Sequence, residues 1–206
     1  TMAQWFIDGF LKRLLNKNDA ISRTLLDQAT FLIVPNMNPD GSRRGHLRTN
    51  AAGINLNREW NDPSQHRSPE VFWVREYMQR IGVDFCMDVH GDEAIPYNFI
   101  AGTEGIPSFT KHQKLLLNEY KAKLAQSNPD FQVKAGYPVN SPGNANLNIC
   151  ANWIAQNFDC LSMTLEQPFK DLGDEEINDE GWSPARSSLL GSSNLDAIYA
   201  VLQKLR

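Results

Sequence analysis

The sequence has few cysteines, no long apolar run and no excess of positive charge, and each shortage excludes a class of protein. Cysteine occurs three times in 206 residues, at Cys86, Cys150 and Cys160. These thiols stand among apolar residues and not in close-spaced pairs, which is typical of buried free cysteines rather than of a disulfide framework or a cysteine zinc knot. Because free thiols persist in reducing compartments, we expect a cytoplasmic protein.

Apolar runs are short as well. No stretch approaches the roughly 20 apolar residues that span a membrane, and the first apolar segment is interrupted by Asp8, Lys12 and Arg13, unlike a signal peptide. With 20 basic and 24 acidic residues, the chain lacks the basic surface that nucleic-acid binding usually needs. We therefore expect neither a membrane nor a nucleic acid as a partner, and the sequence leaves the oligomeric state open.

The composition of the chain is in the ordinary range for a soluble globular protein, with 41% hydrophobic and 21% charged residues. Helical and strand-like patterns alternate along it without a linker or repeat, which predicts one domain over residues 1–206. The expected fold is α/β: a mixed, largely parallel central sheet flanked by helices. The patterns predict helices at 2–14, 69–81, 109–126, 147–158 and about 195–205, and strands at 31–34, 83–89, 97–101 and 160–165.

Polar residues follow three of the predicted strands, at 36–40, at 90–93 and at Glu166. The ligand crevice of such a sheet lies outside the carboxyl ends of its strands, so we expect these groups to converge. Two prolines and a glycine predict irregular backbone over 35–41. The segment 42–67 lacks either periodicity, which is typical of a functional loop. It contains five arginines: Arg43, Arg44, Arg48, Arg58 and Arg67.

Five short motifs then occur in a fixed order: Asn38-Pro-Asp-Gly41, Arg48, Asn55-Leu-Asn-Arg58, Asp88-Val-His-Gly91 and Thr164-Leu-Glu166. In order and spacing they resemble the zinc carboxypeptidases, most closely the cytosolic carboxypeptidase branch. The resemblance covers nearly the whole chain. It implies a zinc-dependent metallocarboxypeptidase, with one Zn²⁺ per complete chain, that hydrolyses the C-terminal peptide bond of a peptide or protein.

The resemblance also implies a role for each motif residue. His90 would bind zinc through its neutral imidazole, and Glu166 would be the general base that takes a proton from zinc-bound water, whose pKa the metal lowers to about 7. Arg58 together with Asn57 would hold the terminal carboxylate of the substrate. Arg48 would stabilise the oxyanion of the tetrahedral intermediate, a role worth about 2.7–4 kcal/mol. The other histidines, His46, His66 and His112, are expected at the surface.

The sequence departs from the family in its metal ligands. The family binds zinc with a His and a Glu from a His-x-x-Glu motif and with a later His, and only the later one, His90, is found. The family motif directly precedes a helix like the one at Met2, so we expect the chain to begin just after it and to lack the N-terminal part of the fold. A less favoured alternative pairs His90 with Glu93; otherwise Asp92 and Glu93 shape the pocket. We assign no tyrosine to catalysis, because Tyr137 stands several residues too early.

Two other functions are compatible with the same residues. An aspartoacylase-type zinc hydrolase of N-acyl amino acids would share the metal site and would also need an arginine for a carboxylate. A non-catalytic module could keep the fold and the arginine cleft without the metal. The substrate side chain is equally open, since nothing charged stands at 150–152, and an acidic substrate would need a base such as Lys134 or Arg44.

Overall fold

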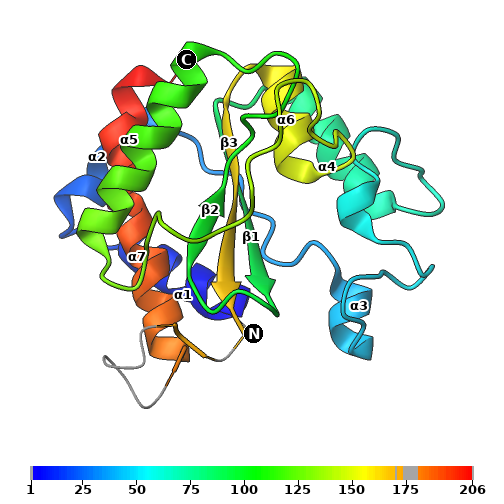
Figure 1. The fold of residues 1–206 in the computed structure, drawn as a ribbon. Coiled ribbons are helices and arrows are strands. Elements are labelled where there is room, and N and C mark those ends of the chain that lie inside the picture. The colour runs from blue at the N-terminus through cyan, green and yellow to red at the C-terminus, as the bar shows by residue number, and fades with distance from the viewer. Residues whose placement is uncertain (1, 170, 174–180, 206) are drawn as a thin grey trace.

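Helices pack on both faces of a three-stranded sheet in the computed structural model, which describes residues 2–169, 171–173 and 181–205 (Figure 1). The strands are β1 (Phe85–Asp92), β2 (Phe99–Ala101) and β3 (Leu161–Pro168), in the order β1-β3-β2. Strand β1 runs parallel to β3 over eight residue pairs, and β2 pairs antiparallel with β3 over three. The described sheet is therefore mixed and mostly parallel, as the sequence predicts.

The helices divide between the two faces of the sheet. Helices α1, α5 and α7 cover one face, and α4 and α6 lie on the other side (Figure 1). The bounds are α1 Met2–Leu14, α2 Ala20–Gln28, α3 Pro39–Arg44, α4 Pro69–Ile81, α5 Lys111–Ser127, α6 Cys150–Phe158 and α7 Pro184–Val201, with single 3₁₀ turns at η1 Leu56–Arg58 and η2 Leu202–Lys204.

The two faces of the sheet differ in chemistry because side chains alternate along a strand. Three of the four odd-numbered residues of β3, Leu161, Met163 and Leu165, are buried in the larger core against α1, α5 and α7. The even-numbered positions of β1 and β3 carry polar groups, among them His90 and Glu166. The apolar face thus anchors the two strands, and the opposite face is free to carry chemistry.

A close helix crossing supports the apolar face. Where α1 meets α7, a Cβ on Gly9 would lie 1.9 Å from the carbonyl oxygen of Ser188, and a Cβ on Gly191 would lie 2.0 Å from the carbonyl oxygen of Phe6. Only glycine permits two backbones to approach so closely. The crossing brings Phe6 and Phe10 into the same core as the strands.

The strand predicted at 31–34 is wrong for the described residues. Phe31 and Ile33 pack against the core, whereas Leu32 and Val34 are 48% and 44% exposed, so the alternation of a strand is present. A strand also needs a hydrogen-bonded neighbour, and no strand among the described residues pairs with this segment. The apolar run predicted a buried strand, but two of its four side chains are exposed and it has no partner strand in the described part of the chain.

Two helices, α2 and α3, form where the sequence predicted no helix. Segment 35–41, expected to be irregular, enters α3, because Asn38 accepts a hydrogen bond from the Gly41 amide at 3.0 Å and Pro39 occupies the first turn. Helix α2 was missed; Asp19 caps its N-terminus, where the Asp19 carboxylate accepts a hydrogen bond from the Ser22 amide at 2.8 Å. Elsewhere the predicted helices and strands agree with the structure to within a few residues at each end, with two exceptions. The last helix, predicted at about 195–205, is α7 and begins much earlier, at Pro184, and the strand predicted at 97–101 shortens to β2.

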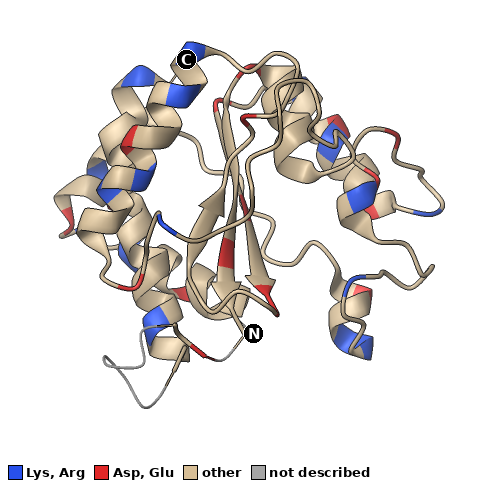
Figure 2. Cartoon of the chain, in the orientation of Figure 1, with Lys and Arg blue, Asp and Glu red and all other residues tan. Residues whose placement is uncertain are grey.

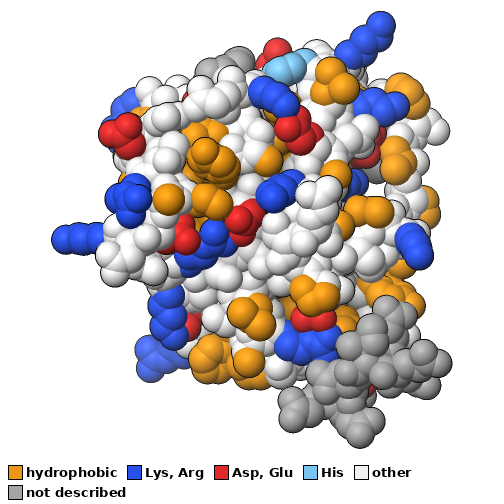
Figure 3. All heavy atoms as spheres, turned by 90° about the vertical axis from the view of Figure 1, so that its left-hand side faces the viewer, with side chains coloured by type: hydrophobic (Ala, Val, Ile, Leu, Met, Phe, Trp, Pro, Cys, Tyr) orange, Lys and Arg blue, Asp and Glu red, His pale blue; other side chains and the backbone are white. Residues whose placement is uncertain are grey.

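Charged side chains are spread over the helices. Figure 2 shows acidic residues near the lower ends of the strands, and Lys and Arg mainly on the surrounding helices and loops. On the face seen in Figure 3, charged side chains of both signs separate small apolar groups. None of the described helices has both the length and the apolar character needed to cross a membrane.

Candidate functional site

The candidate site lies at the carboxyl ends of β1 and β3. The parallel register makes His90 and Glu166 Cα partners, so their side chains leave neighbouring strands on the same face. Nδ1 of His90 lies 3.9 Å from Oε1 of Glu166. Two of the residues singled out from the sequence, 76 positions apart, therefore face each other across one gap between strands.

The His90 ring is held from its other nitrogen by Asp88. Nε2 of His90 lies 2.9 Å from Oδ2 of Asp88, two residues earlier on the same face of β1. The negative charge of Asp88 raises the pKa of His90 to about 9, although burial acts in the opposite direction. Burial acts to raise the pKa of Asp88, but the charge and hydrogen bond of His90 outweigh it and the pKa is lowered. The pair therefore fixes Nε2 and leaves Nδ1 facing Glu166.

Glu166 is a buried carboxyl group. Its side chain is 7% exposed, and burial is the main reason that its pKa rises to about 7, against the opposing charge of His90. Its Oε2 atom is buried and has no hydrogen-bond partner among the described residues. A carboxyl group whose pKa lies near neutrality is suited to accept and release a proton.

Asp92, which the sequence predicts to shape the pocket, and Tyr137, which it does not assign to the site, also lie at this end of the sheet. Asp92 shares the polar face of β1 with His90, and the Tyr137 hydroxyl donates a hydrogen bond to it. The same hydroxyl lies 3.5 Å from Oε1 of Glu166. Tyr137 was set aside on sequence spacing, and the structure instead brings its hydroxyl to the Glu166 carboxylate.

Arg48 lies beside the strand ends but is bound to another residue. Its Nη2 donates to Oε1 of Glu93 at 2.9 Å, and both side chains are about half exposed. Its positive charge acts on both His90 and Asp92, lowering the pKa of each relative to a site without it. Glu93, considered as a metal ligand in the sequence, here pairs with Arg48.

Asn57 makes no hydrogen bond to His90 or Asp88 among the described residues, and Cys150 lies between Asn57 and Asp88. The Oδ1 atom of Asn57 accepts a hydrogen bond from the Cys150 amide at 2.8 Å, at the first turn of α6. The Cys150 side chain in turn acts on the Asp88 carboxyl group: after the charge and hydrogen bond of His90, it is a further influence that lowers the pKa of Asp88. Asn57 is thereby connected to Asp88 and, through it, to His90.

Arg58 is less closely tied to the strands. Its guanidinium donates to the carbonyl oxygen of its neighbour Asn57 at 2.6 Å, and the side chain is exposed. It makes no hydrogen bond with His90 or Glu166 in the described part of the chain. The structure therefore brings His90, Glu166 and Arg48 close together and leaves Arg58 on the adjacent loop.

The residues present fit one side of a zinc site. Nδ1 of His90 faces a buried carboxylate that has an unpartnered oxygen, and a carboxylate on the second ring nitrogen is the usual companion of a metal-binding histidine. Zinc sites normally use three or four protein ligands. Within the described residues no group of three or more His, Cys, Asp or Glu side chains is placed to hold an ion. His90 can therefore supply one ligand, and a complete site needs others.

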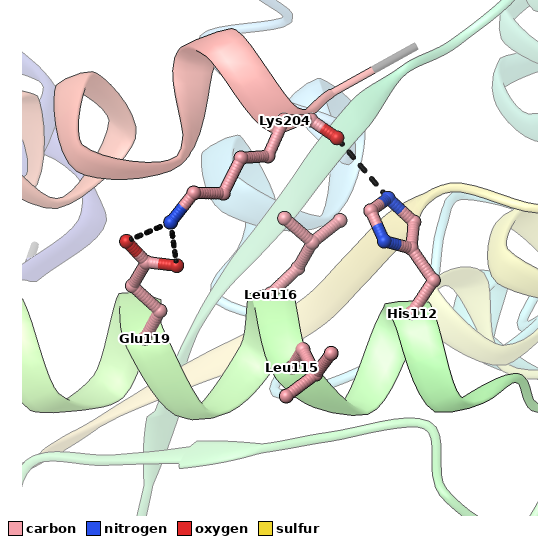
Figure 4. A pocket seen from close by; sticks show the side chains of 5 residues that line it. All are labelled: His112, Leu115, Leu116, Glu119 and Lys204. Atoms are coloured by element: carbon pink, nitrogen blue, oxygen red, sulfur yellow. Dashed lines mark hydrogen bonds and ion pairs between the residues drawn. The ribbon is translucent and has the colours of Figure 1, made fainter.

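A hollow of about 370 Å³ lies away from this site, between α5 and the turn η2 (Figure 4). Its polar groups are already paired: Nε2 of His112 lies 3.1 Å from the carbonyl oxygen of Lys204, and Nζ of Lys204 lies 2.6 Å from Glu119. Its lining is completed by Leu115 and Leu116. None of the predicted site residues lines it, so it carries no part of the candidate site.

The site residues that the sequence did not predict are marked weakly or not at all by local sequence patterns. Asp88 precedes His90 by two positions, a spacing that puts both on one face of a strand, and this could have indicated a histidine partner. Tyr137 and Cys150 reach the site from a loop and a helix start, and no local pattern predicts where such side chains lie.

Comparison with known proteins gives one consistent result. A family model described as zinc carboxypeptidase matches residues 1–181. An uncharacterized protein of Zymomonas mobilis is 53% identical over 205 residues, covering 100% of this chain and 54% of that protein. Human cytosolic carboxypeptidase 4 is 34% identical over 106 residues, covering 48% of this chain and 9% of its own length.

Solved structures agree with this match. The metallo-carboxypeptidase from Pseudomonas aeruginosa, in complex with (2-guanidinoethylmercapto)succinic acid, has a TM-score of 0.95 and 45% identity, covering 100% of this chain and 54% of that one. The metallo-carboxypeptidase from Burkholderia cenocepacia has a TM-score of 0.92 and 45% identity, covering 98% of this chain and 55% of that one. The chain thus spans about half the length of the relatives that match all of it.

Proposed function

Since the chain belongs to the zinc carboxypeptidase family, we propose that it forms one catalytic domain, or most of one, in a zinc-dependent enzyme that releases the C-terminal residue of a peptide or protein. The observation that carries the proposal is the pairing of His90 with Glu166 on adjacent parallel strands, with Nδ1 and Oε1 3.9 Å apart. This arrangement puts a metal-binding nitrogen beside a candidate base.

His90 holds the metal in this proposal. Asp88 occupies Nε2, so Nδ1 is the nitrogen that faces the site. When bound, Zn²⁺ acidifies a water molecule and polarises the carbonyl group of the bond to be cleaved. We propose that the remaining ligands, a His and a Glu by family resemblance, come from sequence that these 206 residues do not contain.

Glu166 moves the proton. As the general base it takes a proton from the attacking water, and as a general acid it delivers that proton to the nitrogen of the leaving amino acid. Burial supports both steps, because it raises the pKa of Glu166 to about 7, where the carboxyl group is readily protonated and deprotonated near neutral pH. The charge of Arg48 is close enough to stabilise an oxyanion beside His90.

Arg58 and Asn57 recognise the substrate terminus. A guanidinium binds a carboxylate through two parallel hydrogen bonds, which makes cleavage specific for the end of a chain. Arg58 is exposed and its guanidinium makes a single hydrogen bond to its own neighbour, so it can turn to a ligand at little cost. The relative from Pseudomonas aeruginosa was crystallised with a succinic acid derivative, and this compound is a suitable carboxylate probe for Arg58.

The proposed setting is the cytoplasm. The free thiols of Cys86 and Cys150 and the partial likeness to cytosolic carboxypeptidases support it. A peptide or protein C-terminus is the proposed partner, and the net charge of −4 gives no reason to expect a nucleic acid.

Glu166→Gln in the full-length protein tests the proposal. The amide keeps the shape of the side chain but cannot accept the proton, so peptide hydrolysis should fall by about 10²–10⁴-fold while the zinc content stays the same. Release of amino acid from an N-acyl amino acid, measured in parallel, separates the peptidase from an aspartoacylase-type hydrolase. Undiminished peptide hydrolysis by the variant would exclude Glu166 as the base.

A further inference from the structure

The outer face of α4, formed by Trp73, Glu76, Tyr77, Arg80 and Ile81, is largely apolar although it is exposed. Trp73 alone is 62% exposed. Its three apolar members are spaced by four residues, so they lie one above another on the same side of the helix. A single exposed apolar residue is ordinary, but a contiguous apolar stripe is typical of a surface that binds another protein.

The inner face of the same helix already holds α4 on the molecule. Val71 is fully buried, and Val74 and Met78 pack with it in the second apolar core. A surface helix normally has one apolar side and one polar side, whereas α4 has apolar residues on both. The side chains of the outer face are therefore not needed to attach α4 to its own chain.

The outer face also carries one charge of each sign. Glu76 and Arg80 are both exposed and stand four positions apart, yet neither forms an ion pair or a hydrogen bond in the part of the chain that the structure describes. The guanidinium of Arg80 lies over the Tyr77 ring instead, 4.9 Å from its centroid. The face therefore has no net charge and retains an acceptor and a donor for an external partner.

The outer face of α4 is separate from the candidate site. Figure 1 shows α4 on the side of the sheet opposite to α5 and α7. The helix ends at Ile81, and the chain then enters β1 at its first residue, Phe85, whereas His90 and Glu166 lie towards the other end of the strands. Binding through α4 therefore leaves the candidate site open.

We infer that the outer face of α4 is a dimer interface, on which α4 of a second copy of this chain packs antiparallel across a two-fold axis. In such an interface the same patch is used by both copies, so it must be complementary to itself. A face that holds one acid, one base and two aromatic rings meets this condition, since it presents to its copy the groups that the copy can bind.

The spacing along α4 shows how the two copies fit. An axis that crosses the helix between Glu76 and Tyr77 brings Trp73 opposite Arg80 of the second copy, because residues equally distant from the axis face each other. A guanidinium over an aromatic ring is an attractive contact. Glu76 then lies about one helical turn from Arg80 of the second copy, within reach of an ion pair. Each copy thus supplies the charged partner that the other lacks.

The expected dimer is weak and reversible. Helix α4 has 13 residues and is about 20 Å long, so two such helices bury less than the standard interface of about 1,600 Å². Tryptophan, tyrosine and arginine are nevertheless the residues that contribute most to binding at interfaces. We expect a dissociation constant on the order of 10 μM.

Sedimentation velocity of the full-length protein, from about 1 to 200 μM, is the test. The unaltered protein should pass reversibly from monomer to dimer over this range. Trp73→Ser should weaken the dimer at least about tenfold, with the melting temperature of the dilute protein unchanged. Trp5→Ser is the matched control, because it makes the same change at an exposed tryptophan on α1 and should leave the dissociation constant as it was.

A charge reversal tests the antiparallel arrangement itself. Arg80→Glu brings two acids together across the axis and should weaken the dimer. Adding Glu76→Arg to that variant restores opposite charges at the same positions and should recover part of the affinity. A double variant that dimerises no better than Arg80→Glu alone would overturn the arrangement.

Two other results would overturn the inference. A dimer that Trp73→Ser leaves unchanged would use another surface. A monomer at every concentration, with Trp73 protected from oxidative labelling, would assign the outer face of α4 to another part of the full-length chain. Peptide hydrolysis does not enter these measurements, so the outcome for Glu166→Gln is independent of them.

Discussion

The two halves of the candidate site are built differently. His90, Asp88 and Glu166 stand on parallel strands whose register makes His90 and Glu166 neighbours, above an apolar face buried in the larger core. Arg48 and Arg58 stand on a loop and are exposed, and among the described residues they hydrogen-bond to Glu93 and to the Asn57 carbonyl oxygen. The strand half is fixed by the fold, whereas the loop half is held only locally.

This difference assigns different tasks to the halves. Groups that handle the metal and the proton need fixed positions, and strands supply them. Groups that receive an incoming substrate must exchange partners, and an exposed arginine with one weak contact can do so.

The largest expected effect is on the free energy of unfolding, for a substitution in the apolar core that supports β1 and β3. Leu165→Ala removes a fully buried side chain directly before Glu166, and we expect the free energy of unfolding to fall by about 2–5 kcal/mol. Leu47→Ala, at a position 72% exposed in the loop half, should change it by less than about 0.5 kcal/mol. Urea unfolding of the full-length protein measures both, and equal losses would refute the contrast.

Arg48 gives the next effect, and here the measurement is catalytic. Arg48→Ala should lower kcat by an amount equivalent to about 2.7–4 kcal/mol, because an oxyanion donor is lost. Glu93→Gln breaks the same ion pair from the other side, and should cost at most about 1 kcal/mol in stability and none of the rate, since the pair is exposed. Steady-state kinetics on both variants would show whether kcat depends on the Arg48–Glu93 ion pair or on the Arg48 guanidinium alone. An equal loss of kcat in both variants would indicate the ion pair.

Arg58 should affect substrate binding and not the fold. Arg58→Ala removes the proposed carboxylate donor, and we expect a loss of about 1.5–3 kcal/mol in kcat/KM with an unchanged melting temperature. Arg43→Ala, on α3, is the matched control for the loss of one positive charge from the same loop region. Titration with (2-guanidinoethylmercapto)succinic acid should show the same weakening for Arg58→Ala alone.

Asp88 has the smallest expected effect, seen in metal affinity and its pH dependence. Asp88→Asn should weaken zinc binding about 10–100-fold, the usual result of losing the partner of a metal-binding histidine. Zinc needs neutral imidazole, and Asp88 raises the pKa of His90 to about 9. Proton competition should therefore begin as the pH falls below about 9 in the unaltered protein, and nearer to the ordinary value of 6.5 in the variant.

The same pKa predicts the stability of the metal-free protein. Because the pKa of His90 is raised from 6.5 to about 9, the His90–Asp88 pair stabilises the fold fully below pH 6.5, and this contribution is lost as the pH rises through about 9. Thermal unfolding with zinc removed should show this loss for the unaltered protein and not for Asp88→Asn. A pH dependence shared by both would exclude the pair as its cause.

The sequence could predict the strand half better than its surroundings. The apolar runs that end at His90 and Glu166 indicated strands, and the ordered motifs selected these residues for the site. Segment 31–34 has the same alternation, but pairing depends on a neighbouring strand that local sequence does not identify. Asn38-Pro-Asp-Gly41 was interpreted as a loop because proline and glycine are common in turns, yet an asparagine cap followed by proline also begins a helix.

The tyrosine shows a second limit of sequence reasoning. Tyr137 was not assigned to the site because of its distance from Glu166 along the chain. In the structure its hydroxyl lies near Glu166, because the turn before Tyr137 is hydrogen-bonded to Asn98, next to β2. Contacts made by the Gln132 side chain and the Phe99 ring decide where that turn lies. Such contacts between distant residues become visible only when the strands are in place.

The most direct test of the central arrangement is to locate zinc in crystals of the full-length protein by anomalous X-ray scattering. The proposed site predicts a zinc peak bound by Nδ1 of His90, on the side that faces the Glu166 carboxylate, with Nε2 still hydrogen-bonded to Asp88. A zinc ion bound elsewhere, with the His90 ring turned away from Glu166, would contradict it.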